Sequence, residues 1–86
     1  GTDVRWEFYA ANKTLTAGAA KIVVTLPVTA LITMAWNINI YNGAATVAAT
    51  AQLNGANLDI YKDIAGSSWA GGETGVYLYV TTAYSW

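Results

Sequence analysis

Two Asn-Gly steps, Asn42-Gly43 and Asn54-Gly55, constrain the fold of this 86-residue chain more than any other feature. Each step lies between stretches in which apolar and polar residues alternate, as they do along β-strands. Asn-Gly is the strongest short-range signal for a two-residue type I′ hairpin, because both central residues of that turn have positive φ. The two steps therefore predict a three-stranded antiparallel meander over residues 30–61.

The predicted turns also fix which residues face each other. A two-residue loop at Asn42-Gly43 pairs Tyr41 with Ala44, and a loop at Asn54-Gly55 pairs Gln52 with Asn57. Both turns then place the same apolar residues on one face: Ile32, Met34, Trp36, Ile38, Ile40, Ala45, Val47, Ala49, Ala51 and Leu53. A slip of one residue would invert every side chain, so the agreement of two turns supports this assignment.

The rest of the chain also favours strands. Alternation predicts an opening strand over residues 4–10, a second strand over 20–26 that Pro27 ends, and a last strand from Val76. Residues 63–75 hold four of the eight glycines and are expected to form the longest loop. No segment has helical periodicity. We therefore expect one all-β domain over residues 1–86: a small antiparallel β-sandwich or jelly-roll-like barrel of six to seven strands, with the first and last strands at its edges.

The chain contains no Cys and no His, which removes the usual nucleophile and base pairs and most metal ligation. Asp59, Asp63 and Glu73 are the only carboxylates outside the N-terminal segment. Two of them could form an acid and base pair for catalysis. Asp59 and Asp63 could also supply two of the several oxygen ligands that a calcium site requires. Solvated charges in turns explain these residues more simply. We expect no catalysis, no cofactor and no metal.

Charged residues make up only 10% of the chain, against about 25% in an ordinary soluble domain. No charge occurs between Lys21 and Asp59. This favours a surface covered by other subunits over the alternative of a neutral solvated face. The candidate interface residues are those of the polar meander face: Asn37, Asn39, Thr46, Thr50 and Gln52.

Two partner classes are not expected. Four scattered basic residues cannot form the positive footprint that nucleic-acid binding requires. The uncharged stretch 22–40 is interrupted by Pro27, Asn37 and Asn39 and alternates like strands, so it predicts no membrane span. No secretory signal is visible in the sequence, and Gly1 is interpreted as a native start or a remnant of processing.

Aromatic residues make up 13% of the chain. Trp6 and Trp36 lie on predicted core faces. Trp69 lies among small residues in the segment 65–72, where it is expected either to stack a sugar as an exposed ring or to plug the end of the sandwich. Tyr77 and Tyr79 point away from the predicted core, as a partner patch, a sugar platform or a cross-strand aromatic pair.

The phrase Lys13-Thr14-Leu15-Thr16-Ala17-Gly18-Ala19-Ala20, followed by short neutral strands and Asn-Gly turns, resembles β-rich modules of phage virion proteins, such as fibre, head-decoration and tail-tip domains. The resemblance implies a trimeric or otherwise symmetric structural module, sometimes with host-glycan binding. We thus expect a non-catalytic, self-associating structural module of an extracellular particle or virion, in contact with itself and with other virion proteins. The alternative is a carbohydrate- or receptor-binding module that uses an exposed Trp69, with Tyr77 and Tyr79 near it.

Overall fold

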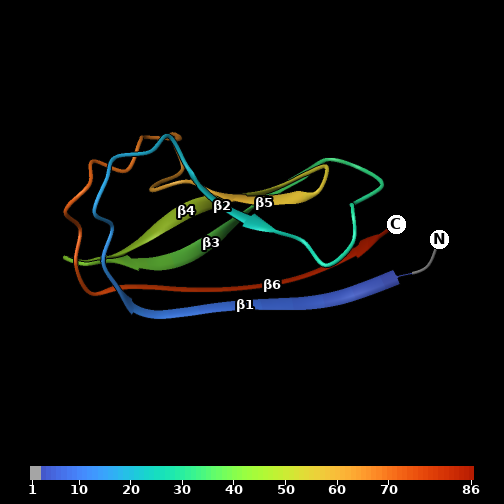
Figure 1. The fold of residues 1–86 in the computed structure, drawn as a ribbon, viewed down its shortest axis with the longest axis horizontal. Coiled ribbons are helices and arrows are strands. Elements are labelled where there is room, and N and C mark those ends of the chain that lie inside the picture. The colour runs from blue at the N-terminus through green and yellow to red at the C-terminus, as the bar shows by residue number, and fades with distance from the viewer. Residues whose placement is uncertain (1–2) are drawn as a thin grey trace.

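The computed structural model describes residues 3–86, which form six β-strands and contain no helix. The strands are β1 (Asp3–Lys13), β2 (Ile22–Thr25), β3 (Met34–Asn42), β4 (Thr46–Asn54), β5 (Asn57–Ile60) and β6 (Val76–Ser85), as Figure 1 shows. The predicted all-β class is confirmed, and β3, β4 and β5 form the predicted meander. Gly1 and its interpretation lie outside the described residues.

All six strands belong to one antiparallel sheet with the order β1-β6-β3-β4-β5-β2. β3 and β6 share only two residue pairs, Tyr41 with Tyr77 and Asn42 with Val76. The sheet bends where these two strands part, so that the limb β1-β6 faces the limb β3-β4-β5-β2 (Figure 1). The predicted two layers are thus the limbs of a single curled sheet, a half-barrel.

The last strand is not an edge, and this part of the prediction is wrong. β6 pairs with β1 along most of its length and with β3 at its start. The two edges of the sheet are β1 and β2. Local alternation gives no information about which distant strands become neighbours, so the position of β6 could not be found from the sequence.

Both hairpins turn one residue later than predicted. The central residues are Gly43-Ala44 and Gly55-Ala56, with φ of 96° at Gly43 and 60° at Gly55. Among residues 3–86 only Asn12 has a positive φ without being glycine, so neither hairpin is type I′. A glycine of positive φ at the first central position is the mark of a type II′ turn.

The side chain of Asn42 has a different role from the predicted one. Its Oδ1 accepts hydrogen bonds from the backbone N–H groups of Ala44 and Ala45, at 2.9 Å and 3.0 Å. Asn42 therefore supports the first turn from the position before it, as Asn side chains commonly do.

The later turns displace every predicted pair by two residues. Met34 lies opposite Leu53, and Leu53 opposite Leu58. An even displacement keeps each side chain on its face, so the predicted apolar face of the meander points inward although the predicted pairs are wrong. The exceptions lie at the ends of the predicted strands: Met34 is exposed at the beginning of β3, Ile32 is exposed ahead of it, and Ala45 is exposed next to the first turn.

The core lies between the two limbs. Its buried members come mainly from the strands β3 to β6: Ile40, Ala49, Ala51, Leu53, Leu58, Ile60, Val76, Leu78, Val80 and Tyr84. Val4, Trp6 and Phe8 on the inner side of β1 are only half-buried. The inner side of the edge strand β1 is therefore covered less completely than that of its neighbour β6 or of β5.

Candidate interaction surface

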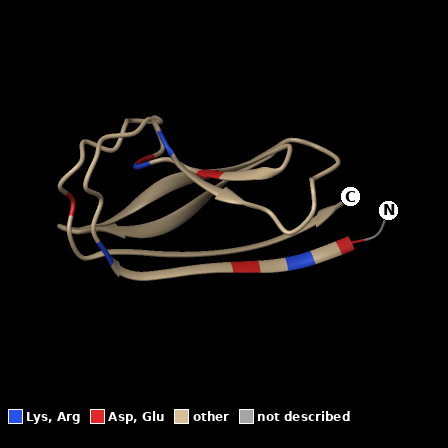
Figure 2. Cartoon of the chain, viewed as in Figure 1, with Lys and Arg blue, Asp and Glu red and all other residues tan. Residues whose placement is uncertain are grey.

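Three neighbouring strands of the sheet, β6, β3 and β4, carry no charged residue (Figure 2). The sequence alone indicated only the neutral meander, and the strand order adds β6 beside it. Tyr41 on β3 lies opposite Tyr77 on β6 and opposite Thr46 on β4. It therefore joins the two patches that the sequence predicted separately. We call the outward side of these three strands the neutral strand surface.

Not all predicted interface residues are equally accessible. Asn37, Asn39 and Thr46 are exposed, whereas Thr50 and Gln52 are half-buried. The hydroxyl of Thr50 donates to the carbonyl of Ile64 at 3.4 Å, which shows that the segment after β5 comes close to this part of β4. The accessible part of the neutral strand surface therefore lies towards β3 and β6.

Tyr77 and Tyr79 are exposed at 43% and 53%, and each packs edge-to-face against a tyrosine of a neighbouring strand. The ring of Tyr77 lies 6.2 Å from that of Tyr41 at 71°, and the ring of Tyr79 lies 6.0 Å from that of Tyr9 at 76°. We call these four residues the tyrosine row. The cross-strand packing that the sequence allowed is present, and the rings still face solvent.

Sequence reasoning did not assign Tyr9 and Tyr41 to this patch. Each lay at an outward position predicted for its own strand, and this was the sign in the sequence that it could belong to an exposed patch. Only the order β1-β6-β3, which is set by distant pairing, makes them neighbours of Tyr79 and Tyr77.

A hydrogen bond fixes one end of the tyrosine row. The hydroxyl of Tyr79 donates to Oε2 of Glu7 at 2.5 Å. This hydrogen bond and the negative charge of Glu7 raise the pKa of Tyr79 above its ordinary value of 10.0, because ionising the phenol would oppose both. The Tyr79 hydroxyl therefore remains a donor at neutral pH.

Trp69 is buried, with only 1% of its surface accessible, so the expectation of an exposed loop ring is wrong. Its Nε1 donates to the carbonyl of Ile60 at 3.2 Å, and its backbone exchanges hydrogen bonds of 2.7 Å and 3.0 Å with Ala19. The irregular loop can bury this ring because it bridges to residue 19. Trp69 is the plug that the sequence offered as the other possibility, and a sugar cannot stack on it in this structure.

The carboxylate of Asp59 is also buried, on the outward side of β5. It accepts hydrogen bonds from Nζ of Lys21 at 3.0 Å and from Nδ2 of Asn54 at 3.3 Å. The hydrogen bond and the charge of Asp59 raise the pKa of Lys21. Asp59 therefore joins β5 to the start of β2 as a structural residue.

The other two candidate carboxylates hold loops together. Asp63 accepts a hydrogen bond from the N–H of Ser67 at 2.9 Å, and the hydrogen bonds of Ser67 lower the pKa of Asp63. Glu73 forms an ion pair with Lys62 at 3.2 Å. Within residues 3–86, no three acidic side chains gather where a metal ion would bind.

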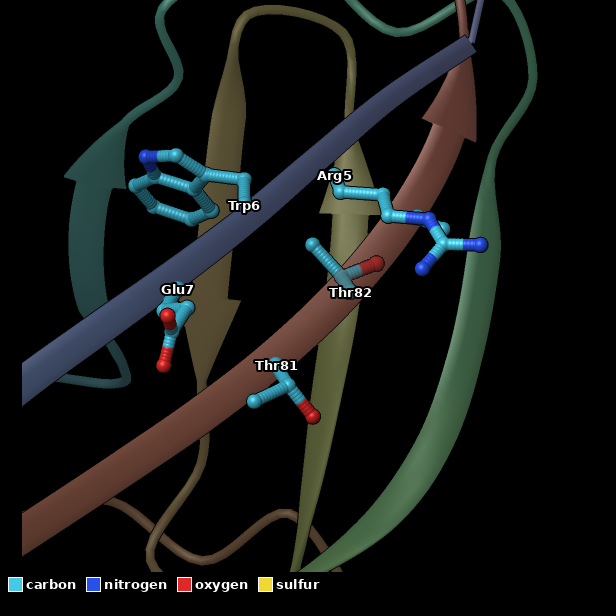
Figure 3. A pocket seen from close by; sticks show the side chains of 6 residues that line it. Arg5, Trp6, Glu7, Thr81 and Thr82 are labelled. Carbon is cyan, nitrogen blue, oxygen red and sulfur yellow. The ribbon is translucent and has the colours of Figure 1, made fainter.

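A hollow of about 480 Å³ lies along β1 and β6 (Figure 3). It is lined by Arg5, Trp6, Glu7, Thr81, Thr82 and Ala83. In Figure 3 the side chains of Arg5 and Trp6 extend in opposite directions from β1. The polar groups therefore do not converge on one ligand, as they do in a small-molecule site.

Within the described part of the chain there is no helix of the length and apolar character needed to cross a membrane. Comparison of the chain with protein-family models, with curated proteins and with solved structures finds no match. A proposal about function therefore rests on the residues of this chain.

Proposed function

We propose that this chain is a non-catalytic structural module that associates with copies of itself through the neutral strand surface. The observation that carries this proposal is the side-by-side position of three uncharged strands, whose outward side bears exposed tyrosine, asparagine and threonine side chains. Burying neutral amides and hydroxyls that find partners avoids the large desolvation penalty of charges. Closed symmetric assemblies are the usual result when one surface binds its own copy.

The setting that we propose is an extracellular particle or fibre such as a phage virion, with a trimer favoured. Two observations support it. The segment 13–20, the short neutral strands and the Asn-Gly turns resemble those of virion modules, and the charge content is too low for an ordinary solvated surface. Other virion proteins would then be the further partners.

The test is the mass in solution, measured by light scattering after size exclusion over a range of dilutions. Asn39→Lys with Thr46→Lys places two charges on the exposed part of the neutral strand surface and should lower the mass of the assembly, because the contacts of this surface are lost. Thr25→Lys with Thr29→Lys adds the same charge at exposed positions in and after β2, and should leave the mass unchanged. An assembly whose mass is unchanged by the first pair of substitutions contradicts the proposal.

The second candidate function is binding of a host-surface carbohydrate, now on the tyrosine row instead of Trp69. Exposed tyrosine rings with their hydroxyl groups favour it, because such rings combine an apolar face with a hydrogen-bonding edge. Tyr77→Ala with Tyr79→Ala should then abolish retention on a glycan array while the strand signal in circular dichroism persists. A wild-type chain that binds no glycan on the array contradicts this candidate.

A further inference from the structure

The two edges of the sheet differ in how well they are protected. β1 has eleven residues, and among the described residues it pairs with β6 alone. β2 has four residues and lies between Lys21 and Pro27, a charge and a residue without an N–H group. Charges, bulges, prolines and short length are the usual protection of an edge. β1 also carries charged side chains and a bulge after Ala10, but its residues 3–10 form a long regular run, and no proline interrupts it. The outer row of backbone N–H and C=O groups on β1 is therefore a template for another strand.

The inner side of β1 also has apolar surface left to bury. Val4, Trp6 and Phe8 are half-buried, and the rings of Trp6 and Phe8 stack at 6.3 Å and 26°. A strand added beside β1 would extend the sheet and cover these side chains.

We propose that β1 of one copy pairs antiparallel with β1 of a second copy, about a two-fold axis at Trp6. In this register Arg5 lies opposite Glu7 of the second copy, and the symmetry repeats this pair. On the inner side, Val4 lies opposite Phe8 of the second copy, and the two Trp6 side chains meet at the axis. The two half-barrels then share one continuous sheet. This contact is separate from the neutral strand surface and adds a second surface to the proposed self-association.

Charge and geometry select this register. The axis must pass through a residue, because an axis between two residues would set inward side chains against outward ones. An axis at Arg5 or at Glu7 places that charge against its own copy, which is destabilising. An axis at Phe8 runs into the bulge that follows Ala10. An axis at Val4 would set Arg5 opposite Asp3, but it would not bring the half-buried Trp6 and Phe8 side chains against apolar side chains of the second copy.

The two charged residues of this register are placed to meet a partner. Within residues 3–86, the guanidinium of Arg5 forms no ion pair or hydrogen bond, and the side chain extends away from Trp6 (Figure 3). Glu7 is exposed on the same side of β1 and accepts its hydrogen bond from Tyr79 through Oε2. Its other carboxylate oxygen is left for the guanidinium of the second copy.

Charge reversal tests the register. Arg5→Glu alone, or Glu7→Arg alone, places like charges opposite each other twice, so either should raise the dimer dissociation constant by about tenfold or more. An equal mixture of the two variants has opposite charges at each of these pairs and should form a heterodimer. Lys13→Glu makes the same charge change as Arg5→Glu but lies beyond the bulge, so it should leave the constant unchanged. The measurement is sedimentation equilibrium, with circular dichroism to show that each variant is folded.

Cross-linking gives a second measurement of the register. The chain has no Cys, so a mixture of Arg5→Cys and Glu7→Cys has one thiol per copy. Residues directly opposite each other in an antiparallel pair have Cα atoms about 4.5–5.5 Å apart, which suits a disulfide. The mixture should therefore oxidise to the mixed dimer faster than either variant forms its own dimer.

A wild-type chain that is monomeric at every concentration, or a charge-reversed mixture that stays monomeric, overturns the edge pairing. If Asn39→Lys with Thr46→Lys dissociates the assembly and Arg5→Glu does not, the edge pairing fails and the proposed function stands. The reverse result contradicts self-association through the neutral strand surface and supports the edge pairing. The two proposals therefore fail separately.

Discussion

Two regions of the curled sheet, the edge strand β1 and the interior strands β4 and β5, share the same alternating pattern but bury their inner sides to different degrees. Five inner residues of β4 and β5 have no accessible surface: Ala49, Ala51, Leu53, Leu58 and Ile60. Val4, Trp6 and Phe8 of β1 remain half-buried. The difference follows from the segment after β5, residues 61–75, which brings Trp69 into the core and binds it to Ile60 and Ala19. Alternation decides which side of a strand faces inward, and tertiary contacts decide how much water that side loses.

The strongest test of this difference compares two tryptophans. Trp69→Ala should reduce the free energy of unfolding by about 3–5 kcal/mol, because it leaves a cavity and removes the hydrogen bond to the Ile60 carbonyl. Trp6→Ala removes the same side chain from the half-covered strand β1 and should reduce the free energy of unfolding clearly less. Urea unfolding at a concentration where the wild type is monomeric measures both. Equal losses, or a larger loss for Trp6→Ala, would show that β1 is packed as tightly as the region around Trp69.

The second test concerns the backbone of the covering segment. Gly71 and Gly72 both have positive φ, of 91° and 85°. A Cβ on Gly71 would lie 2.7 Å from the backbone nitrogen of Gly18, whereas a Cβ on Gly72 would meet nothing within 4 Å. Gly72→Ala should therefore lower the free energy of unfolding by about 1–2 kcal/mol, the penalty of a non-glycine residue in the left-handed region. Gly71→Ala should lower it more, because the segment must also move away from residue 18.

Thermal unfolding of the two variants gives this comparison. Gly72→Ala is the matched control, because it carries the penalty of the positive φ without the steric clash. If both glycine variants lose the same stability, the close approach between residues 71 and 18 is not what holds the covering segment.

The faces of the meander could be predicted from the sequence although its turns were not. Asn-Gly-Ala occurs at both turns, and the glycine takes the first central position instead of the second. This choice moves each turn by one residue and each pair by two, which leaves inward residues inward. Because side chains alternate along a strand with a period of two, the wrong turn position did not change which side of the sheet each residue faces.

The neutral strand surface was predictable in part. Asn37, Asn39 and Thr46 lay at outward positions, and the structure leaves them exposed. Their continuity with Tyr77 depends on the β3–β6 pairing, which no local pattern contains. The burial of Trp69 depends in the same way on a bridge to residue 19, fifty positions earlier in the chain. Irregular segments show no periodicity from which such contacts can be inferred.

The smallest effect that we expect is a pH dependence of the covering segment, and it comes from Glu73. Desolvation pushes the pKa of Glu73 upward, but hydrogen bonds from its own N–H and that of Ala70, from the Lys62 ammonium and from the N–H of Gly71 together hold it below 4.5. A carboxyl whose pKa is lower in the folded state stabilises the fold above its unfolded pKa, and this contribution is lost as the pH falls through the folded value.

Glu73→Gln should therefore be less stable than the wild type at neutral pH, and the difference should shrink as the pH falls below about 4.5. Lys62→Met removes the ion pair but leaves the backbone N–H donors, so it should reproduce only part of the pH dependence. Urea midpoints between neutral pH and pH 3 measure both variants. A gap between Glu73→Gln and the wild type that stays constant over this range would mean that the carboxylate does not hold residues 70–73. The close cover of β4 and β5 would then depend on Trp69 and the glycine contacts alone.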